Sequence, residues 1–128
     1  MFHHPHFRVT CKAAIYDPTR QFVLVANYTP TKNGLPGGHL ELDELPDEAM
    51  ARELQEEIGF VPDNLERKDF WIHRNGKLIL GYISTASKDQ TLDIDPREVR
   101  SADWVSLDKI RSGEVFLDSY EEFVLKWA

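Results

Sequence analysis

The pattern of apolar and polar residues at the start of the chain predicts a β-hairpin. Two β-rich runs, Phe7–Asp17 and Gln21–Tyr28, lie on either side of the turn sequence DPTR, which has proline at its second position. The second run is short and mostly apolar, as expected of a buried strand. The polar residues Thr29–Gly34 that follow predict a loop.

The second half of the chain adds further strands and two helical segments. Leu65–His73 and Lys77–Thr85 predict two strands about an RNG turn, and the polar run Ser87–Glu98 predicts a loop. Val99–Leu107 predicts a strand that runs into the start of a helix. Apolar residues recur at helical spacing within Glu114–Ala128, at Phe116, Leu117, Tyr120, Phe123, Val124 and Trp127. Strands with interspersed helices predict an α/β or α+β layer fold, with the 128 residues in a single domain.

A helix with two different faces is predicted between Asp43 and Gly59. Asp43 suits the N-terminal cap, Pro46 the first turn and Gly59 the C-terminal exit. Apolar residues recur every four positions and predict a face that packs on the core: Met50, Leu54 and Ile58.

The adjacent face of this helix is acidic. At about 100° per residue, Glu53, Glu56 and Glu57 fall on one arc, with Arg52 just beyond it. Ala49 lies within the arc, and its short side chain is expected to leave space there. Each like-charge pair costs only about 0.2–0.5 kcal/mol on an exposed helix, so a solvated acidic surface is one explanation. A cation site is the other.

Charge distribution favours the cation site. The formal net charge is −7, and the segment Glu41–Glu57, with eight acids and one base, carries all of it. The rest of the chain sums to zero and has no basic run, which argues against extended nucleic-acid binding. The preceding LPGG, Leu35–Gly38, can bring a carbonyl close to a ligand. Carboxylates and a carbonyl are the oxygen ligands that Mg²⁺ or Mn²⁺ accepts, and the EF-hand pattern is absent.

Nothing in the sequence predicts a membrane span or a secretory signal. No segment approaches the ~18 apolar residues of a membrane helix, and Met1–Phe7 lacks the regions of a signal peptide. The histidines near this terminus could bind a transition metal, but an untethered terminus is the favoured interpretation: His3, His4 and His6. The single cysteine, Cys11, makes no internal disulfide and is compatible with a reducing cytoplasm, the expected location.

The segment Gly38–Phe60 resembles the Nudix box, G-x5-E-x7-R-E-U-x-E-E-x-G-U, in which U is a bulky apolar residue. Gly38, Glu44 and RELQEEIGF, Arg52–Phe60, agree at all defined positions. The LPGG lead-in and the later segment Glu98–Leu107 also look like the usual Nudix layout. The resemblance implies a Nudix fold, a mixed β-sheet sandwiched between helices, with the box forming a loop–helix–loop. It also implies metal-dependent hydrolysis of a nucleoside diphosphate linked to a second group, X.

The resemblance implies chemical roles for the acidic face. Glu53, Glu56, Glu57 and the carbonyl of Gly37 would bind Mg²⁺ or Mn²⁺, and Glu53 would be a ligand or the general base. Arg52 would hold Glu53 or a neighbouring carboxylate in position.

Other box residues would support the site. Glu44 would support the cluster from the helix start, and Gly38 and Gly59 would be needed for backbone geometry. Glu98 lies where some relatives place an extra acid, as a base or ligand; an exposed loop acid is the alternative. Basic side chains are candidates for phosphate or base contacts, each weak alone: Arg8, Lys12, Lys32 and Arg74. His39 could also reach the substrate, although a polar residue at a strand edge is favoured.

The implied substrate is a small nucleotide, a (d)NTP or an oxidised dNTP, cleaved by a pyrophosphohydrolase. Signatures that mark several other subgroups are absent from their expected positions, but nucleotide sugars, ADP-ribose, dinucleoside polyphosphates and RNA 5′ ends are alternative substrates. A non-catalytic nucleotide-sensing module is a further alternative, although such modules usually carry a degraded box. The expected partner is a small molecule, and a homodimer is compatible with the resemblance.

Overall fold

The computed structural model describes residues 4–128. Residues 1–3 lie outside the described residues. They include His3, one of the three histidines weighed above as a transition-metal site against an untethered terminus. The described elements, in chain order, are β1 (Val9–Tyr16), β2 (Phe22–Thr29), β3 (Lys32–Gly34), β4 (Gly37–His39), α1 (Pro46–Ile58), β5 (Glu66–Ile72), β6 (Leu78–Thr85), β7 (Ser101–Ser106), α2 (Leu107–Arg111) and α3 (Glu121–Trp127). No helix within residues 4–128 has the length and apolar character needed to cross a membrane.

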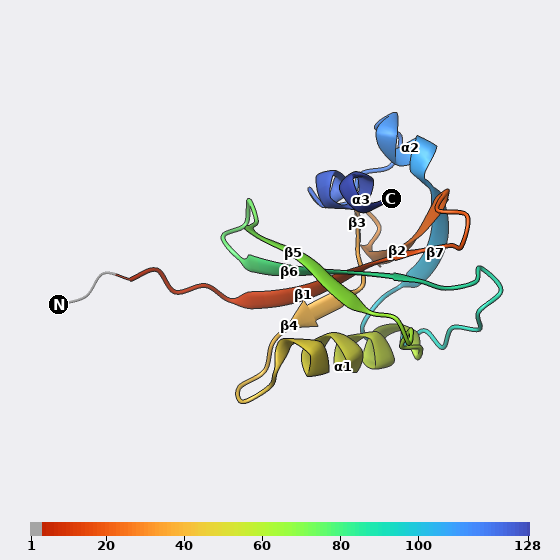
Figure 1. Ribbon diagram of the computed structural model, residues 1–128. Coiled ribbons are helices and arrows are strands. Elements are labelled where there is room, and N and C mark those ends of the chain that lie inside the picture. The colour runs from red at the N-terminus through yellow and green to blue at the C-terminus, as the bar shows by residue number, and fades with distance from the viewer. Residues whose placement is uncertain (1–3) are drawn as a thin grey trace.

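The strands form one mixed sheet between helices, as the sequence predicts. The strand order is β3-β2-β1-β6-β5, with β4 beside β1 and β7 beside β2. β1 and β6 run parallel over their full length, and the other described pairings are antiparallel. Helix α1 covers one face of the sheet, and α2 and α3 cover the other (Figure 1).

Alternation along β1 divides the core between these two faces. Cys11, Ala13 and Ile15 pack with the apolar side of α1, whereas Ala14 and Tyr16 pack with residues of α2 and α3. All five side chains are fully buried, so β1 is the central strand of both cores. Each helix is therefore held against a fixed face of the sheet.

The N-terminal hairpin is shorter than predicted. β1 and β2 pair only through Tyr16 and Val23, because β2 then diverges to pair with β7 while β4 and β6 flank β1. The turn itself is confirmed, and Asp17 stabilises it by accepting hydrogen bonds from the backbone N–H groups of Gln21 and Phe22. The predicted loop after β2 contains the short strand β3.

Helix α1 begins later than predicted. Asp43 does not cap it, because Asp43 lies in a turn at φ 63° and the helix starts at Pro46. Leu45 is the capping residue, and the Glu48 carboxylate accepts its backbone N–H at 3.0 Å. The C-terminal exit through Gly59 at φ 65° is confirmed.

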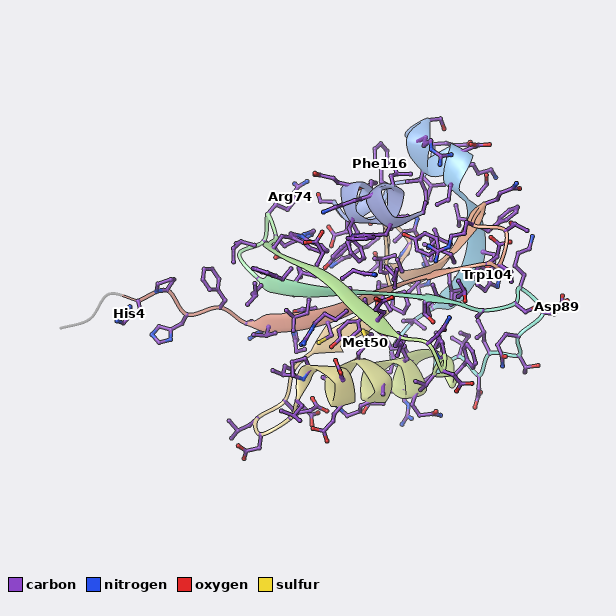
Figure 2. The ribbon with its side chains drawn as sticks, in the orientation of Figure 1. His4, Met50, Arg74, Asp89, Trp104 and Phe116 are labelled. Atoms are coloured by element: carbon purple, nitrogen blue, oxygen red, sulfur yellow. The ribbon has the colours of Figure 1, made fainter. Side chains whose placement is uncertain are left out.

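The predicted C-terminal helix over Glu114–Ala128 is only partly formed. Asp118 and Ser119 adopt left-handed backbone angles, φ 54° and 69°, which end any helix that precedes them. The helix α3 therefore starts at Glu121. Phe116, predicted to face the core, is 72% exposed, and its side chain projects from the top of the molecule in Figure 2.

Candidate active site

Strand β4 brings two glycines between β1 and α1. In the β1–β4 pairing, Gly37 lies opposite Lys12 and Gly38 lies opposite Cys11. A Cβ on Gly37 would meet the Cys11 carbonyl oxygen at 2.0 Å, and a Cβ on Gly38 would meet the Glu53 carboxyl group at 2.5 Å. Only residues without a side chain allow the strand to approach both neighbours.

The three glutamates of the acidic face differ in burial. Glu57 is 3% exposed, and its Oε1 accepts the backbone N–H of Gly37 at 2.6 Å. Burial raises the pKa of Glu57, an effect that the positive charge of Lys12 and the Gly37 hydrogen bond oppose. Burial also raises the pKa of Glu53, whereas Glu56 is exposed. A uniformly solvated acidic surface therefore does not describe this face.

Ala49 does not leave space within the acidic arc. Its side chain is fully buried and packs in the core on the α1 side of the sheet. The prediction was wrong because this part of the helix faces the sheet directly, which turns Ala49 inward next to Met50.

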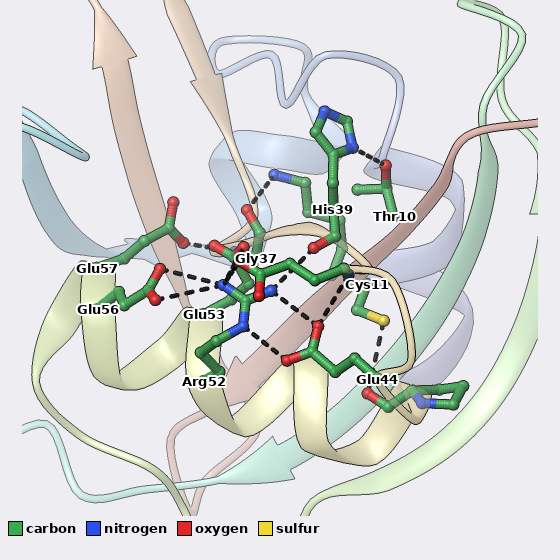
Figure 3. A network of polar contacts seen from close by, with 12 residues as sticks. Thr10, Cys11, Gly37, His39, Glu44, Arg52, Glu53, Glu56 and Glu57 are labelled. Atoms are coloured by element: carbon green, nitrogen blue, oxygen red, sulfur yellow. Dashed lines mark hydrogen bonds and ion pairs between the residues drawn. The ribbon is translucent and has the colours of Figure 1, made fainter.

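Arg52 lies at the centre of the carboxylates and bonds to several of them (Figure 3). Its Nε donates to Glu44 at 2.7 Å, and its Nη1 donates to Glu53 at 3.0 Å and to Glu56 at 3.2 Å. Its Nη2 donates to the carbonyl of His39 at 3.0 Å. Hydrogen bonding to Glu44 raises the pKa of Arg52 above its ordinary value. The guanidinium thus joins the helix start, the acidic face and β4.

Lys12 provides a second cation next to the glutamates. Its ammonium group donates to the Tyr28 hydroxyl at 3.2 Å, to the Leu35 carbonyl at 3.0 Å and to the Gly37 carbonyl at 3.1 Å. Burial lowers the pKa of Lys12, and the negative charge of Glu57 opposes that shift. The backbone of Gly37 is therefore held on both sides, since its carbonyl oxygen accepts from Lys12 and its N–H donates to Glu57.

The donor atoms suit a hard cation, although the structure does not gather them around one point. No group of three or more His, Cys, Asp or Glu residues within residues 4–128 is arranged as a ligand cluster. Glu53 and Glu56 nevertheless share one Arg52 nitrogen, and Glu57 and Glu53 both contact the Gly37–Gly38 segment. Carboxylate and carbonyl oxygens are the ligands that Mg²⁺ and Mn²⁺ prefer.

The predicted site residues that lie outside the Nudix box are spread over different parts of the structure. Glu98 is on an exposed loop, and its charge adds to the burial that raises the pKa of Glu53. Lys32 lines a cavity beside β4, whereas Arg74 lines a separate cavity near β5 and bonds to Ser119. Arg8 is exposed and lines neither of these cavities.

The cavity beside β4 is also lined by residues that sequence patterns did not indicate as part of the site, among them Lys77, Asp118 and Tyr120. They lie just before β6 and in the segment before α3. No local motif marks them, because only the pairing of β6 with β1 and the position of α3 bring them near β4.

Comparison with known proteins identifies the family. The NUDIX domain family model matches residues 6–124. The chain belongs to the Nudix family. Phosphatase NudJ of Escherichia coli is similar to this Nudix protein, with 31% identity over 115 residues that span 83% of this chain and 71% of NudJ. As a member of this family, the present protein is a hydrolase of the kind that cleaves diphosphate linkages. The family generally uses divalent metals.

Solved structures show the same fold. The NUDIX domain of Shewanella oneidensis NrtR, complexed with ADP ribose, superposes with a TM-score of 0.77 at 20% identity, covering 96% of this chain and 86% of that one. A MutT NUDIX hydrolase from Burkholderia pseudomallei gives a TM-score of 0.73 at 23% identity, covering 95% and 98%. The fold predicted from the Nudix box is therefore confirmed.

Proposed function

We propose that this Nudix hydrolase is a metal-dependent pyrophosphohydrolase of a small nucleotide, with a (d)NTP or an oxidised dNTP as the favoured substrate. The observation that carries the proposal is the buried carboxylate of Glu57, held on Gly37 beside Glu53. A buried carboxylate with a raised pKa is unfavourable in the ionised form, and a cation bound beside it relieves that cost.

Glu53, Glu56, Glu57 and the Gly37 carbonyl would hold Mg²⁺ or Mn²⁺. When bound, the metal would neutralise diphosphate charge and lower the pKa of a coordinated water. The family's general use of divalent metals and the all-oxygen donor set support this assignment.

The protein's own groups then position the reacting parts. Arg52 holds Glu53 and Glu56 by hydrogen bonds and ties them to the β4 backbone. Glu53 is the favoured general base, because its raised pKa makes it a better proton acceptor from water than an ordinary carboxylate. Glu98 is the second candidate base. Its charge contributes to the raised pKa of Glu53, which is the effect of a nearby carboxylate.

The test is a hydrolysis screen with product identification. We expect a nucleoside monophosphate and pyrophosphate from (d)NTPs in the presence of Mg²⁺, and a loss of roughly 100-fold or more in Glu53→Gln and Glu57→Gln. Glu114→Gln changes an exposed acid outside the site and serves as the matched control. Tight nucleotide binding without turnover would select the sensing module, and wild-type rates in Glu57→Gln would refute the assignment of the site.

A further inference from the structure

A cavity of about 140 Å³ adjoins the candidate active site at Gly37 and Gly38. Side chains from several separate segments line it, and among the described residues they include three lysines but only one carboxylate: Lys12, Lys32, Lys77 and Asp118. The cavity is therefore cationic in a chain whose net charge is −7. We refer to it as the lysine pocket.

The charges of the lysine pocket act on one another. Lys12, Lys32 and Lys77 line the same small cavity, so their positive charges lie close together. Like charges held this close repel one another unless an anion lies between them.

Two of the three ammonium groups are available to a ligand. Lys12 uses its three N–H donors on protein acceptors. Lys32 makes one ion pair, with Asp118 at 3.7 Å, in which both side chains are well exposed, so that pair contributes little. Among the described residues, Lys77 has neither a hydrogen-bond nor an ion-pair partner for its ammonium group.

The walls of the lysine pocket are fixed by the fold. Asp118, which lines the pocket, and the next residue, Ser119, hold consecutive left-handed backbone angles, an arrangement that costs free energy and persists only where the surroundings enforce it. His73 enforces it by bonding through its Nε2 to the Asp118 carbonyl at 2.8 Å. Two other lining residues, Thr10 and His39, are hydrogen-bonded to each other at 2.9 Å.

We propose that the lysine pocket binds a phosphate group of the substrate that lies beyond the scissile diphosphate. The inference rests on the proposed function, because Gly37 both lines the pocket and bonds to Glu57, which places the pocket next to the proposed metal site. An uncharged group would leave the Lys77 ammonium without a partner, whereas a phosphate offers charge-assisted hydrogen bonds to both Lys77 and Lys32. The phosphate is the terminal group of a triphosphate or a monoester on the nucleoside.

Matched substrate pairs test this selectivity and separate the two sources of phosphate. The first pair is a nucleoside triphosphate and its diphosphate, and the second is coenzyme A and dephospho-coenzyme A. We expect wild-type kcat/KM to be at least about tenfold higher for the phosphate-bearing member of one pair, and Lys77→Met or Lys32→Met to remove most of that preference. Lys109→Met, an exposed lysine on α2, is the control and should retain it. The inference would be overturned if the lysine variants lost kcat/KM equally for both substrates of a pair, or if their preference for the phosphate-bearing substrate were unchanged.

A binding measurement distinguishes this inference from the proposed function. Inorganic tripolyphosphate in metal-free buffer should raise the Tm of the wild type and of Lys109→Met, but not of Lys77→Met. If the wild type hydrolyses nucleotides and this difference is absent, the lysine pocket is refuted while the proposed function stands. If the difference is present without any hydrolysis, the proposed function fails and the anion site is retained.

Discussion

At the scale of single residues, the contact between Gly38 and Glu53 links the backbone to the proposed chemistry. We predict that Gly38→Ala reduces activity by roughly 100-fold, because its Cβ would lie 2.5 Å from the Glu53 carboxyl and displace it. Gly38 does not require a left-handed backbone, so the loss in stability should be small. Steady-state kinetics and urea unfolding measure the two effects separately.

Gly113→Ala is the reciprocal control. Gly113 has φ 79°, and a Cβ there would meet nothing within 4 Å, so alanine strains the backbone without touching the site. We expect it to cost about 1–2 kcal/mol of stability and to leave activity unchanged. If Gly38→Ala and Gly113→Ala had equal activities, the positioning of Glu53 by the backbone at Gly38 would be contradicted.

Arg52 offers a test of positioning by a guanidinium. We predict that Arg52→Lys lowers kcat about 10–100-fold although it keeps the charge, because an ammonium group cannot reach Glu44, Glu53 and the His39 carbonyl together. The pH dependence of kcat should also shift, since Arg52 opposes the effect of burial on the pKa of Glu53. If Arg52→Lys were less stable but kept the wild-type pH dependence of kcat, the role of Arg52 would be structural only.

At the scale of elements, the turn between β1 and β2 depends on Asp17. This side chain accepts hydrogen bonds from Thr19, from the hydroxyl as well as the backbone, and from the N–H groups of Gln21 and Phe22. We predict that Asp17→Ala costs about 1–3 kcal/mol in urea unfolding at pH 7. Asp17→Asn keeps one acceptor oxygen and should lose less.

The contribution of Asp17 should depend on pH. Burial alone would raise its pKa, but the hydrogen bonds outweigh burial and hold the pKa below the ordinary value of 3.8. The folded state therefore binds the proton less readily than the unfolded state, and the stabilisation is essentially complete above about pH 5 and is lost as the pH falls through the pKa values of the two states. The difference in unfolding free energy between wild type and Asp17→Ala should shrink as the pH is lowered from about 5 to about 3. A constant difference would contradict this.

The accuracy of prediction differed between helices for a physical reason. For α1, local signals agreed with the fold: Gly59 ends it and Met50 and Leu54 face the core, so its position was predictable apart from the cap. Before α3, the apolar spacing was equally regular, yet Ser119 and its neighbour take left-handed angles fixed by a contact with His73, the residue after β5. A contact between segments so distant in sequence leaves no local pattern.

The same distinction applies to the site. The metal-binding candidates lie within one short motif, so Glu53 and Glu57 could be named from sequence alone. The burial of Glu57 could not, because it arises from β4 folding back against β1. Lys77 could not be named either, because its position depends on the parallel pairing of β6 with β1.

At the scale of the whole molecule, opposite charges lie side by side around β4. The acidic segment Glu41–Glu57 carries the net charge of the chain, while the lysine pocket adjoins it across Gly37 and Gly38. A polyanionic substrate alone would be attracted to the lysines and repelled by the glutamates. Binding to both regions therefore requires cations at the glutamates, which couples metal binding to substrate binding.

Metal binding should consequently stabilise the folded protein. We predict that Mg²⁺ or Mn²⁺ raises the Tm relative to protein in EDTA, by an amount equivalent to about 2.7 kcal/mol at a metal concentration about 100 times its Kd, because the unfolded chain does not assemble the site. Differential scanning calorimetry across a metal titration measures the shift. Glu57→Gln should lose most of it, and the control Glu114→Gln should keep it. Equal shifts in all three proteins would mean that the metal binds the acidic segment nonspecifically, and the absence of a shift at saturating Mn²⁺ would remove the metal site altogether.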